Sequence, residues 1–211
     1  MCRKKIKRFY MIYHFTYFKK YILYVFLLLG CIYSRELSLE SSMPLINYSL
    51  IETNGEKTTL KKVMGQNGTL VIFSCNTCPW VLRWQDRYVS IAREYKKKGI
   101  GMIAVNSNVS KFDGDDSLDE MAIHATKNDY NFAYVQDPES KLAHAFGATK
   151  TPHVYLFNDQ NKLVYRGAID DNARNKSKVD KAFLKNALDQ MLAGEKITKP
   201  VSKALGCSIK F

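Results

Sequence analysis

The chain has 211 residues, of which 46% are hydrophobic and 25% charged, values that suit one globular domain with a buried core. Its formal net charge of +12 is uneven, because residues 1–20 carry seven basic side chains and no acid, which leaves +5 for the rest. That remainder is of mixed sign and contains no basic stripe, so the composition excludes a nucleic-acid-binding surface of the usual kind.

Residues 1–30 join this basic head to a short apolar segment. The run "YILYVFLLLGC", which ends at Cys31, is uncharged but shorter than the about 20 residues that a membrane-spanning helix requires. Such a pattern is typical of a signal peptide or an N-terminal membrane anchor. The segment "LLGC" resembles the lipobox of bacterial lipoproteins, which makes Cys31 a candidate lipidation site. We therefore expect an exported, membrane-anchored protein of the cell envelope, on its periplasmic side, with residues 31–43 as a polar tether.

Residues 44–211 contain no linker or repeat and are expected to form one domain. "LINYSLI" predicts a first strand, and the Asn-Gly turn in "ETNGEKTTL" leads to a short second one. The continuous apolar run "GTLVIFS", residues 68–74, is typical of a buried central strand.

A strong helix pattern follows. One apolar stripe, spaced by three and four residues, is formed by Val81, Trp84, Tyr88, Ile91 and Tyr95. Pro79 suits the first helical turn, and Gly99 suits the position just after the end. The next apolar run, "IGMIAVNS", predicts a strand parallel to the first central one, because a strand–helix–strand unit makes a right-handed crossover.

The second half of the chain predicts a further set of elements. These are a helix at 117–128 that opens with a capping box, a strand at "NFAYVQD", a short helix at 139–146, an antiparallel hairpin of "HVYLF" with "KLVYRG", and a final helix at 179–193. Strands and helices in this order predict an α/β fold with a central mixed sheet flanked by helices.

Two cysteines lie between the predicted buried strand and the predicted helix that follows it. Cys75 and Cys78 form a Cys-x-x-Cys pair directly before Pro79. Free N–H groups and the positive end of the helix dipole favour a thiolate at such a place, so these thiols are expected to have lowered pKa values. We expect Cys75 to attack a partner disulfide and Cys78 to resolve the mixed disulfide that results.

Other interpretations of the pair carry less weight. A structural disulfide would close too small a loop to stabilise the fold much. A zinc site normally needs a second pair of ligands, which the sequence lacks. Copper handling by Cys75, Cys78 and a histidine stays open, because thiolates suit Cu(I). We favour a redox dithiol that needs no cofactor and no metal and whose partners are the thiols and disulfides of other proteins.

The motifs "SCNTCPWV", "FGATKTPHVYLFN" and "GCSIKF" together resemble the thioredoxin-like redoxin-domain proteins, a branch of the alkyl hydroperoxide reductase/thiol-specific antioxidant superfamily. The resemblance implies a thioredoxin fold over residues 44–211 and thiol–disulfide oxidoreductase activity. It also implies that Pro152 is cis and faces the dithiol, and that the backbone of Thr151 pairs with the bound substrate segment.

One departure bears on the activity. Peroxiredoxins of this superfamily place Thr or Ser three residues before their peroxidatic cysteine, whereas Ile72 lies three before Cys75. A thiol peroxidase that uses Cys75 is therefore the alternative and dithiol exchange the preferred function.

Three more residues are candidates for the site. Trp80, beside the dithiol, and His153, after Pro152, are candidates for substrate binding, although each also suits ordinary packing. Cys207 is either a third redox thiol that reaches the dithiol or a buried small apolar residue, and the sequence favours the second interpretation.

Overall fold

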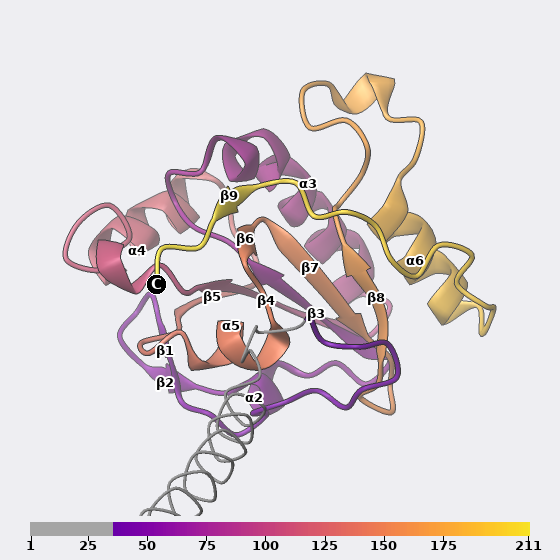
Figure 1. Cartoon of the computed structure of the whole chain (residues 1–211), viewed down its shortest axis with the longest axis horizontal. Coiled ribbons are helices and arrows are strands. Elements are labelled where there is room, and N and C mark those ends of the chain that lie inside the picture. The colour runs from indigo at the N-terminus through magenta and orange to yellow at the C-terminus, as the bar shows by residue number, and fades with distance from the viewer. Residues whose placement is uncertain (1–35) are drawn as a thin grey trace, which may run out of the picture. The chain divides into compact units, whose positions relative to one another are not determined.

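The computed structural model describes residues 36–211, which form one compact unit (Figure 1). The expected signal or anchor at 1–30, the lipidation site Cys31 and the first part of the expected tether lie outside the described residues. Within residues 36–211, no helix has both the length and the apolar character needed to cross a membrane.

A seven-stranded mixed sheet forms the centre of the domain. In spatial order its strands are β2 (Lys57–Thr58), β1 (Leu50–Glu52), β5 (Ala133–Gln136), β4 (Ile100–Asn106), β3 (Gly68–Phe73), β7 (His153–Phe157) and β8 (Leu163–Gly167). The three inner strands β5, β4 and β3 run parallel, and the pairs β3–β7, β7–β8, β1–β5 and β1–β2 are antiparallel. The predicted central mixed sheet and the parallel pair around the strong helix are thus confirmed.

Helices lie on both faces of this sheet. They are α2 (Leu60–Val63), α3 (Pro79–Lys96), α4 (Leu118–Lys127), α5 (Lys141–Phe146) and α6 (Phe183–Leu192), together with short 3₁₀ turns at Val109–Lys111 and Lys176–Lys178. The N-cap half of the capping box predicted before α4 is present, because the backbone N–H of Glu120 donates to the Ser117 hydroxyl, whereas the Ser117 N–H donates to the Gly114 carbonyl.

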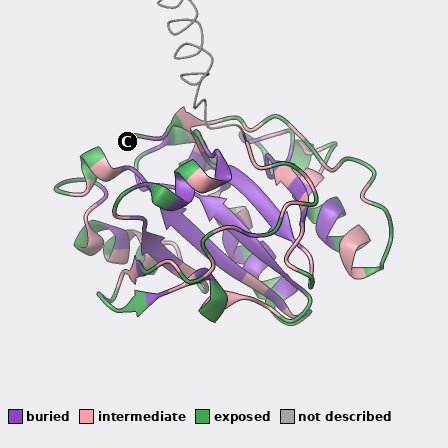
Figure 2. Cartoon of the chain, turned by 60° about the horizontal axis from the view of Figure 1, so that its bottom comes forward, coloured by how far each residue is buried: buried purple, intermediate pink, exposed green. Residues whose placement is uncertain are grey.

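The alternation of side chains along β3 divides the core into two layers. Leu70 and Ile72 pack with the apolar faces of α3 and α6. Val71 and Phe73, which point to the opposite face, pack with residues of α5 and α2. Figure 2 shows the resulting band of buried strands through the middle of the domain. A strand buried on both faces explains why the sequence of β3 is continuously apolar.

Two elements begin at least four residues later than the sequence predicts. β1 starts at Leu50, because the chain before it makes a turn in which Tyr48 N–H donates to the Leu45 carbonyl and Leu45 has a φ of 52°. α6 starts at Phe183, because the preceding residues form a separate loop closed by a hydrogen bond from the Asn172 amide to the Lys178 carbonyl. In both places polar and backbone contacts compete with the local apolar pattern.

The segment Glu36–Met43, which the sequence assigned to a tether, packs on the domain instead. Leu163 N–H donates to the Ser41 carbonyl at 2.9 Å, and Glu40 N–H donates to the Leu163 carbonyl at 2.9 Å. Met43 is buried in the core layer beside α5. This part of the expected tether differs from the prediction because its leucines and methionine bury apolar surface at the edge of β8.

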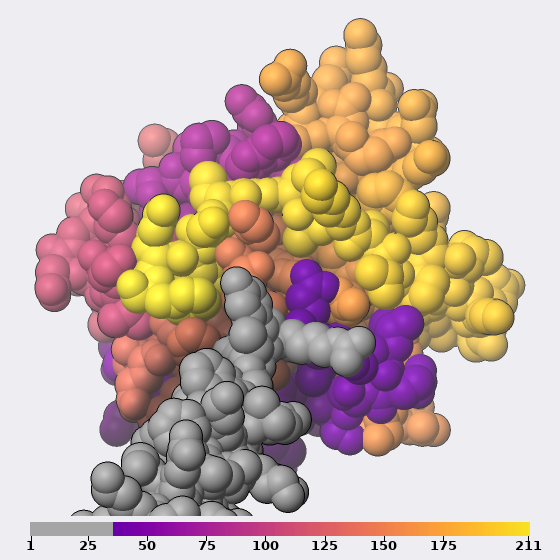
Figure 3. Space-filling view, in the orientation of Figure 1, coloured from indigo at the N-terminus to yellow at the C-terminus, as the bar shows by residue number. Residues whose placement is uncertain are grey.

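A second, two-stranded sheet lies at the rim of the domain. β6 (Lys150–Thr151) pairs antiparallel with β9 (Cys207–Ser208), so that Thr151 lies opposite Cys207. We call residues 200–211, which contain β9, the C-terminal strap. Figure 3 shows the yellow C-terminal segment lying over the orange surface of the β6–β7 region.

Candidate active site

The dithiol occupies the junction between β3 and α3. Cys75 follows the strand after one residue, and Cys78 is the N-cap residue of α3, with Pro79 in the first turn as predicted. The two residues are 2% and 4% exposed, so neither sulfur has a large open surface. Both cysteines are free thiols in this structure.

A buried carboxylate holds the loop between the two cysteines in place. Asp116, which is fully buried, accepts hydrogen bonds from the Asn76 backbone N–H at 2.8 Å and from the Asn108 amide at 2.9 Å. The Asn76 amide oxygen in turn accepts a hydrogen bond from the Tyr134 hydroxyl. Since each of these groups is satisfied, the loop conformation is fixed from beneath.

The residue before the cis-proline faces both sulfurs. The Thr151–Pro152 peptide bond is cis, as the resemblance implied. The Cys78 thiol donates to the Thr151 carbonyl at 3.0 Å, and the Cys75 sulfur lies 3.4 Å from the Thr151 hydroxyl. The structure therefore brings together four of the residues that the sequence singled out.

The pKa values of the two thiols depend on each other. Pairing with Cys75 lowers the pKa of Cys78 against the opposing effect of burial, and the neighbouring Cys207 thiol lowers it further. The same pairing, followed by burial, raises the pKa of Cys75, and the negative charge of Asp116 adds to this. When Cys78 loses its proton, its hydrogen bond to the Thr151 carbonyl is lost.

The direction of these pKa shifts favours the anion on Cys78, whereas the sequence-based expectation placed it on Cys75, so which sulfur attacks first stays a prediction. Cys78, not Cys75, is the N-cap residue of α3, although its side chain makes no capping hydrogen bond to the first turn. Cys75 sits at the end of the buried strand, close to a buried carboxylate. The spacing of the motif predicts the site but not which of its sulfurs meets the helix.

Cys207 lies beside the dithiol. It is half-buried and packs against the core layer that contains Cys75 and Cys78. Burial, followed by its hydrogen bond with the Cys78 thiol, raises the pKa of Cys207 to about 11. The sequence favoured a merely buried residue here, whereas the pairing of β9 with β6 brings this thiol into contact with Cys78.

Trp80 stays at the rim of the site. Its half-buried ring packs on Trp84, with ring centroids 5.9 Å apart, and the Arg83 guanidinium lies 5.3 Å from its centroid. Trp84 is fully buried and donates to the Asp170 carboxylate, as its position on the apolar stripe indicates. Trp80 therefore keeps one side available for a partner, and its expected role in substrate binding stays a prediction.

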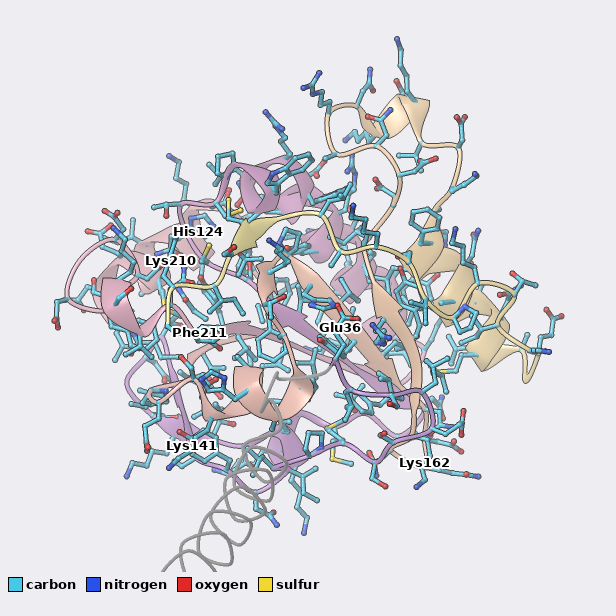
Figure 4. The ribbon with its side chains drawn as sticks, viewed as in Figure 1. Glu36, His124, Lys141, Lys162, Lys210 and Phe211 are labelled. Atoms are coloured by element: carbon cyan, nitrogen blue, oxygen red, sulfur yellow. The ribbon has the colours of Figure 1, made fainter. Side chains whose placement is uncertain are left out.

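His153 takes a different position from the one expected of a substrate-binding residue. It is 1% exposed, its ring lies 4.5 Å from that of Tyr155, and its Nε2 is 3.9 Å from the carboxylate of Glu36, a residue labelled in Figure 4. Burial lowers the pKa of His153 to about 4. A side chain so placed offers no surface to a partner. His153 is paired with Phe73 of β3 and points to the same buried face of the sheet.

Sequence reasoning missed the supporting residues Asp116, Asn76 and Tyr134. The only signal was the group of acids in the loop after β4, and nothing in that group shows which acid is buried. Among residues 36–211, no cluster of three or more His, Cys, Asp or Glu side chains is arranged to hold a metal ion.

Comparison with known proteins places the dithiol and the cis-proline within one family. The family model described as Redoxin matches residues 39–183, which include Cys75, Cys78, Thr151 and Pro152. The match ends before the C-terminal strap, so Cys207 lies outside the matched range.

Individual relatives agree with this match. The thiol–disulfide oxidoreductase ResA of Halalkalibacterium halodurans is 25% identical over 119 residues, which are 56% of this chain and 63% of that protein. An uncharacterised conserved protein from Geobacillus kaustophilus is 32% identical with a TM-score of 0.76, over 82% of this chain and 92% of that one. A thioredoxin-like protein solved in its oxidised form has a TM-score of 0.59 at 20% identity, over 75% and 99% of the two chains. The fold is thus thioredoxin-like, as the motifs implied.

Proposed function

The chain belongs to the Redoxin family, and on that premise we propose that it is a thiol–disulfide oxidoreductase that exchanges electrons with partner proteins through Cys75 and Cys78. The curated relative ResA carries that activity in its name, and the match spans somewhat less than two thirds of its length. Cys78 provides the nucleophile, and Cys75 provides the second sulfur that the exchange requires.

The exchange balances without a cofactor. The Cys78 thiolate attacks one sulfur of a partner disulfide, the partner's S–S bond breaks, and the other partner sulfur leaves as a thiolate. The Cys75 thiol then gives its proton to the departing sulfur and attacks the Cys78 sulfur, which releases the partner as a dithiol and leaves a Cys75–Cys78 disulfide. Run in reverse, the same steps oxidise a partner dithiol.

One observation carries the proposal: both sulfurs meet Thr151 beside a cis-proline at the start of a helix. The hydroxyl and carbonyl of Thr151 orient the two thiols, and the N-terminus of α3 stabilises the anion on Cys78. A pair of buried thiols with no chemical role would not require a lowered pKa at one of them.

The test is a stoichiometric oxidation of the reduced full chain. One equivalent of oxidised glutathione should consume two thiols per chain and yield a Cys75–Cys78 disulfide, which mass spectrometry of the alkylated protein detects. Equimolar hydrogen peroxide or Cu(I) should consume these thiols more slowly. The matched variant Cys75→Ser should stop at a glutathione adduct or use another thiol. If wild type reacts no faster with glutathione disulfide than a free cysteine does, dithiol exchange is not its function.

One contact favours a thiol peroxidase as the second candidate. The Thr151 hydroxyl, 3.4 Å from the Cys75 sulfur, is a hydroxyl that the position of Ile72 does not supply. If this hydroxyl orients peroxide, Thr151→Val should slow peroxide consumption far more than exchange with glutathione disulfide. Equal slowing of both reactions would assign the hydroxyl to positioning of the thiols alone.

We also propose that the chain is exported and anchored to the membrane of the cell envelope through residues 1–30 or a lipid on Cys31. The support is the sequence pattern of a basic head, an apolar run and "LLGC". Mass spectrometry of the N-terminus of the native protein decides between the forms. A mature chain that begins at a lipidated Cys31 supports lipidation, whereas an unmodified, cleaved N-terminus supports a simple signal peptide.

A further inference from the structure

The C-terminal strap is hydrogen-bonded to the rest of the domain on both sides of β9. Before β9, Ser202 N–H donates to the Arg166 carbonyl at 3.0 Å and the Ser202 hydroxyl hydrogen-bonds with Tyr165. After β9, Ile209 N–H donates to the Thr149 carbonyl at 3.0 Å, and Lys210 N–H donates to the Asn108 amide oxygen at 2.8 Å. Figure 4 labels Lys210 and Phe211, with which the strap ends. The strap thus has a built position on the domain.

β9 occupies the backbone edge of the residue before the cis-proline. In the ladder between β6 and β9, Thr151 lies directly opposite Cys207. The approach is close, because a Cβ on Gly206 would fall 2.2 Å from the Thr151 carbonyl oxygen. Cys207 therefore lies next to the two thiols, at the backbone edge of Thr151 that β9 occupies.

All three cysteines of the described residues converge on Thr151. Its hydroxyl faces Cys75, its carbonyl accepts from Cys78, and its ladder partner is Cys207. They differ in exposure, since Cys75 and Cys78 are buried and Cys207 is half-buried. A partner protein thus meets Cys207 before it meets the dithiol.

We propose that Cys207 is a third redox thiol, which exchanges with Cys78 and carries the disulfide between the buried dithiol and partner thiols. This inference rests on the proposed function, because it needs the Cys75–Cys78 disulfide as its starting point. It assigns to β9 the role of a built-in substrate segment.

The relay is an isomerisation that needs no outside electrons. The Cys207 thiolate attacks the Cys78 sulfur, the Cys75–Cys78 bond breaks, and Cys75 leaves as a thiolate that takes up the proton lost by Cys207. A partner thiolate then attacks the Cys207 sulfur and Cys78 leaves. A second partner thiol attacks the mixed disulfide on Cys207, which frees Cys207 and leaves the partner oxidised and the chain reduced.

The test maps disulfides in the full chain with Cys2→Ser and Cys31→Ser, so that Cys75, Cys78 and Cys207 are its remaining cysteines. Cys75 and Cys78 share one tryptic peptide, because no Lys or Arg lies between Lys62 and Arg83. In this background Cys75→Ser should give a Cys78–Cys207 cross-link after oxidation with glutathione disulfide. Cys207→Ser should give only Cys75–Cys78, and Cys78→Ser should form intramolecular disulfide at least about tenfold more slowly.

The unsubstituted background chain provides the same measurement with the dithiol intact. After an acid quench, it should show the Cys207 peptide linked to the dithiol peptide next to the Cys75–Cys78 form. Cys207→Ser should slow disulfide transfer to a reduced partner protein by at least about tenfold, with a smaller effect on a small thiol such as dithiothreitol.

The outcomes separate the two levels of the argument. If the Cys75–Cys78 disulfide forms rapidly but Cys207 stays alkylatable in both the background chain and Cys75→Ser, the relay is wrong and the proposed function stands. If no disulfide forms in any of the chains, the proposed function itself fails. A Cys75–Cys207 disulfide in Cys78→Ser that forms as fast as the Cys75–Cys78 and Cys78–Cys207 disulfides would also contradict the relay, because exchange with Cys207 would then not require Cys78.

Discussion

The dithiol loop and the C-terminal strap reach the same residue by different means. Cys75 and Cys78 are placed by their neighbours in sequence: a buried strand ends, a helix begins, and the loop between them is five residues long. Cys207 is placed by a two-residue ladder with a strand more than 50 residues earlier and by hydrogen bonds on each side of it. Both regions meet at Thr151.

This difference separates two kinds of stability. The loop is supported by a buried strand, a long helix and a satisfied carboxylate, so it should open only with the whole domain. The strap crosses the surface with exposed side chains at Val201 and Leu205 and is held by a few backbone hydrogen bonds. We expect it to open locally, which would let a partner reach the dithiol while the loop stays fixed.

The largest expected effect removes the sulfur on which both regions converge. In the chain with Cys2→Ser and Cys31→Ser, Cys78→Ser should lower the rate of exchange with glutathione disulfide by at least about 100-fold at neutral pH, since burial keeps the pKa values of Cys75 and Cys207 raised and a serine hydroxyl does not ionise. Stopped-flow measurement of thiol consumption gives the rate. Cys75→Ser is the matched variant and should retain the fast first attack. Equal loss in both variants would return the nucleophile to Cys75.

The next effect concerns the support of the loop. Asp116→Ala should lower the free energy of unfolding by about 3 kcal/mol, because it leaves the Asn76 N–H and the Asn108 amide without their charged acceptor. Urea denaturation measures the change. Asp113→Ala in the same loop is the control, since Asp113 is exposed, and its effect should stay within about 0.5 kcal/mol. Similar losses in both variants would mean that the loop does not depend on Asp116.

The loss of folding stability at acid pH should come from His153 in the sheet beneath the loop and not from the strap. Burial places the pKa of His153 at about 4 in the folded protein, below the 6.5 of an unperturbed histidine. A depressed folded pKa gives stability that is fully present above pH 6.5 and is lost as the pH falls through about 4. His153→Gln should remove between about 2 and 3 kcal/mol of this pH dependence. Urea titrations from pH 7 to pH 4 measure it, and unchanged slopes would rule out His153 as the source.

A smaller effect should separate strap from loop directly. Gly206→Ala places a Cβ 2.2 Å from the Thr151 carbonyl oxygen, which the strap relieves only by moving away. We expect alkylation of Cys78 by iodoacetamide to speed up by about tenfold, with the free energy of unfolding changed by less than about 1 kcal/mol.

Gly114→Ala is the matched control for Gly206→Ala, because the nearest atom to its Cβ, the Lys111 carbonyl oxygen, is 3.9 Å away. It should leave the alkylation rate unchanged. Acceleration in the control, or global unfolding in Gly206→Ala, would show that the strap is part of the same cooperative unit as the loop.

The same contrast explains what the sequence could predict. The strands and helices around the dithiol follow from apolar periodicity, a proline at the start of α3 and a capping box before α4, all of which are local signals. The thioredoxin-like fold and the four residues Cys75, Cys78, Thr151 and Pro152 follow from motifs and their resemblance. Asp116 does not follow from them. The contact of Cys207 with Cys78, which the sequence raised only as the less favoured of two interpretations, depends on pairing between distant segments that no local pattern encodes.

His153 shows a second limit of sequence reasoning. Its position after the cis-proline predicts contact with substrate, but side chains alternate across a strand, and β7 turns this one into the sheet. The ionisation of the dithiol has a similar cause: which sulfur meets the N-terminus of α3 depends on the path of a few loop residues.

The smallest expected effect tests what remains at the surface once the strap opens. Trp80 lies between the loop and solvent, half-buried and packed on Trp84. If a partner protein rests on this ring, Trp80→Ala should raise the KM for a protein disulfide by about threefold, with little change in kcat or in exchange with glutathione disulfide. Arg83→Ala, which removes only the cation beside the ring, is the control. A loss that appears equally with glutathione disulfide would mean that Trp80 supports the helix start, since a small disulfide has no surface with which to reach the rim.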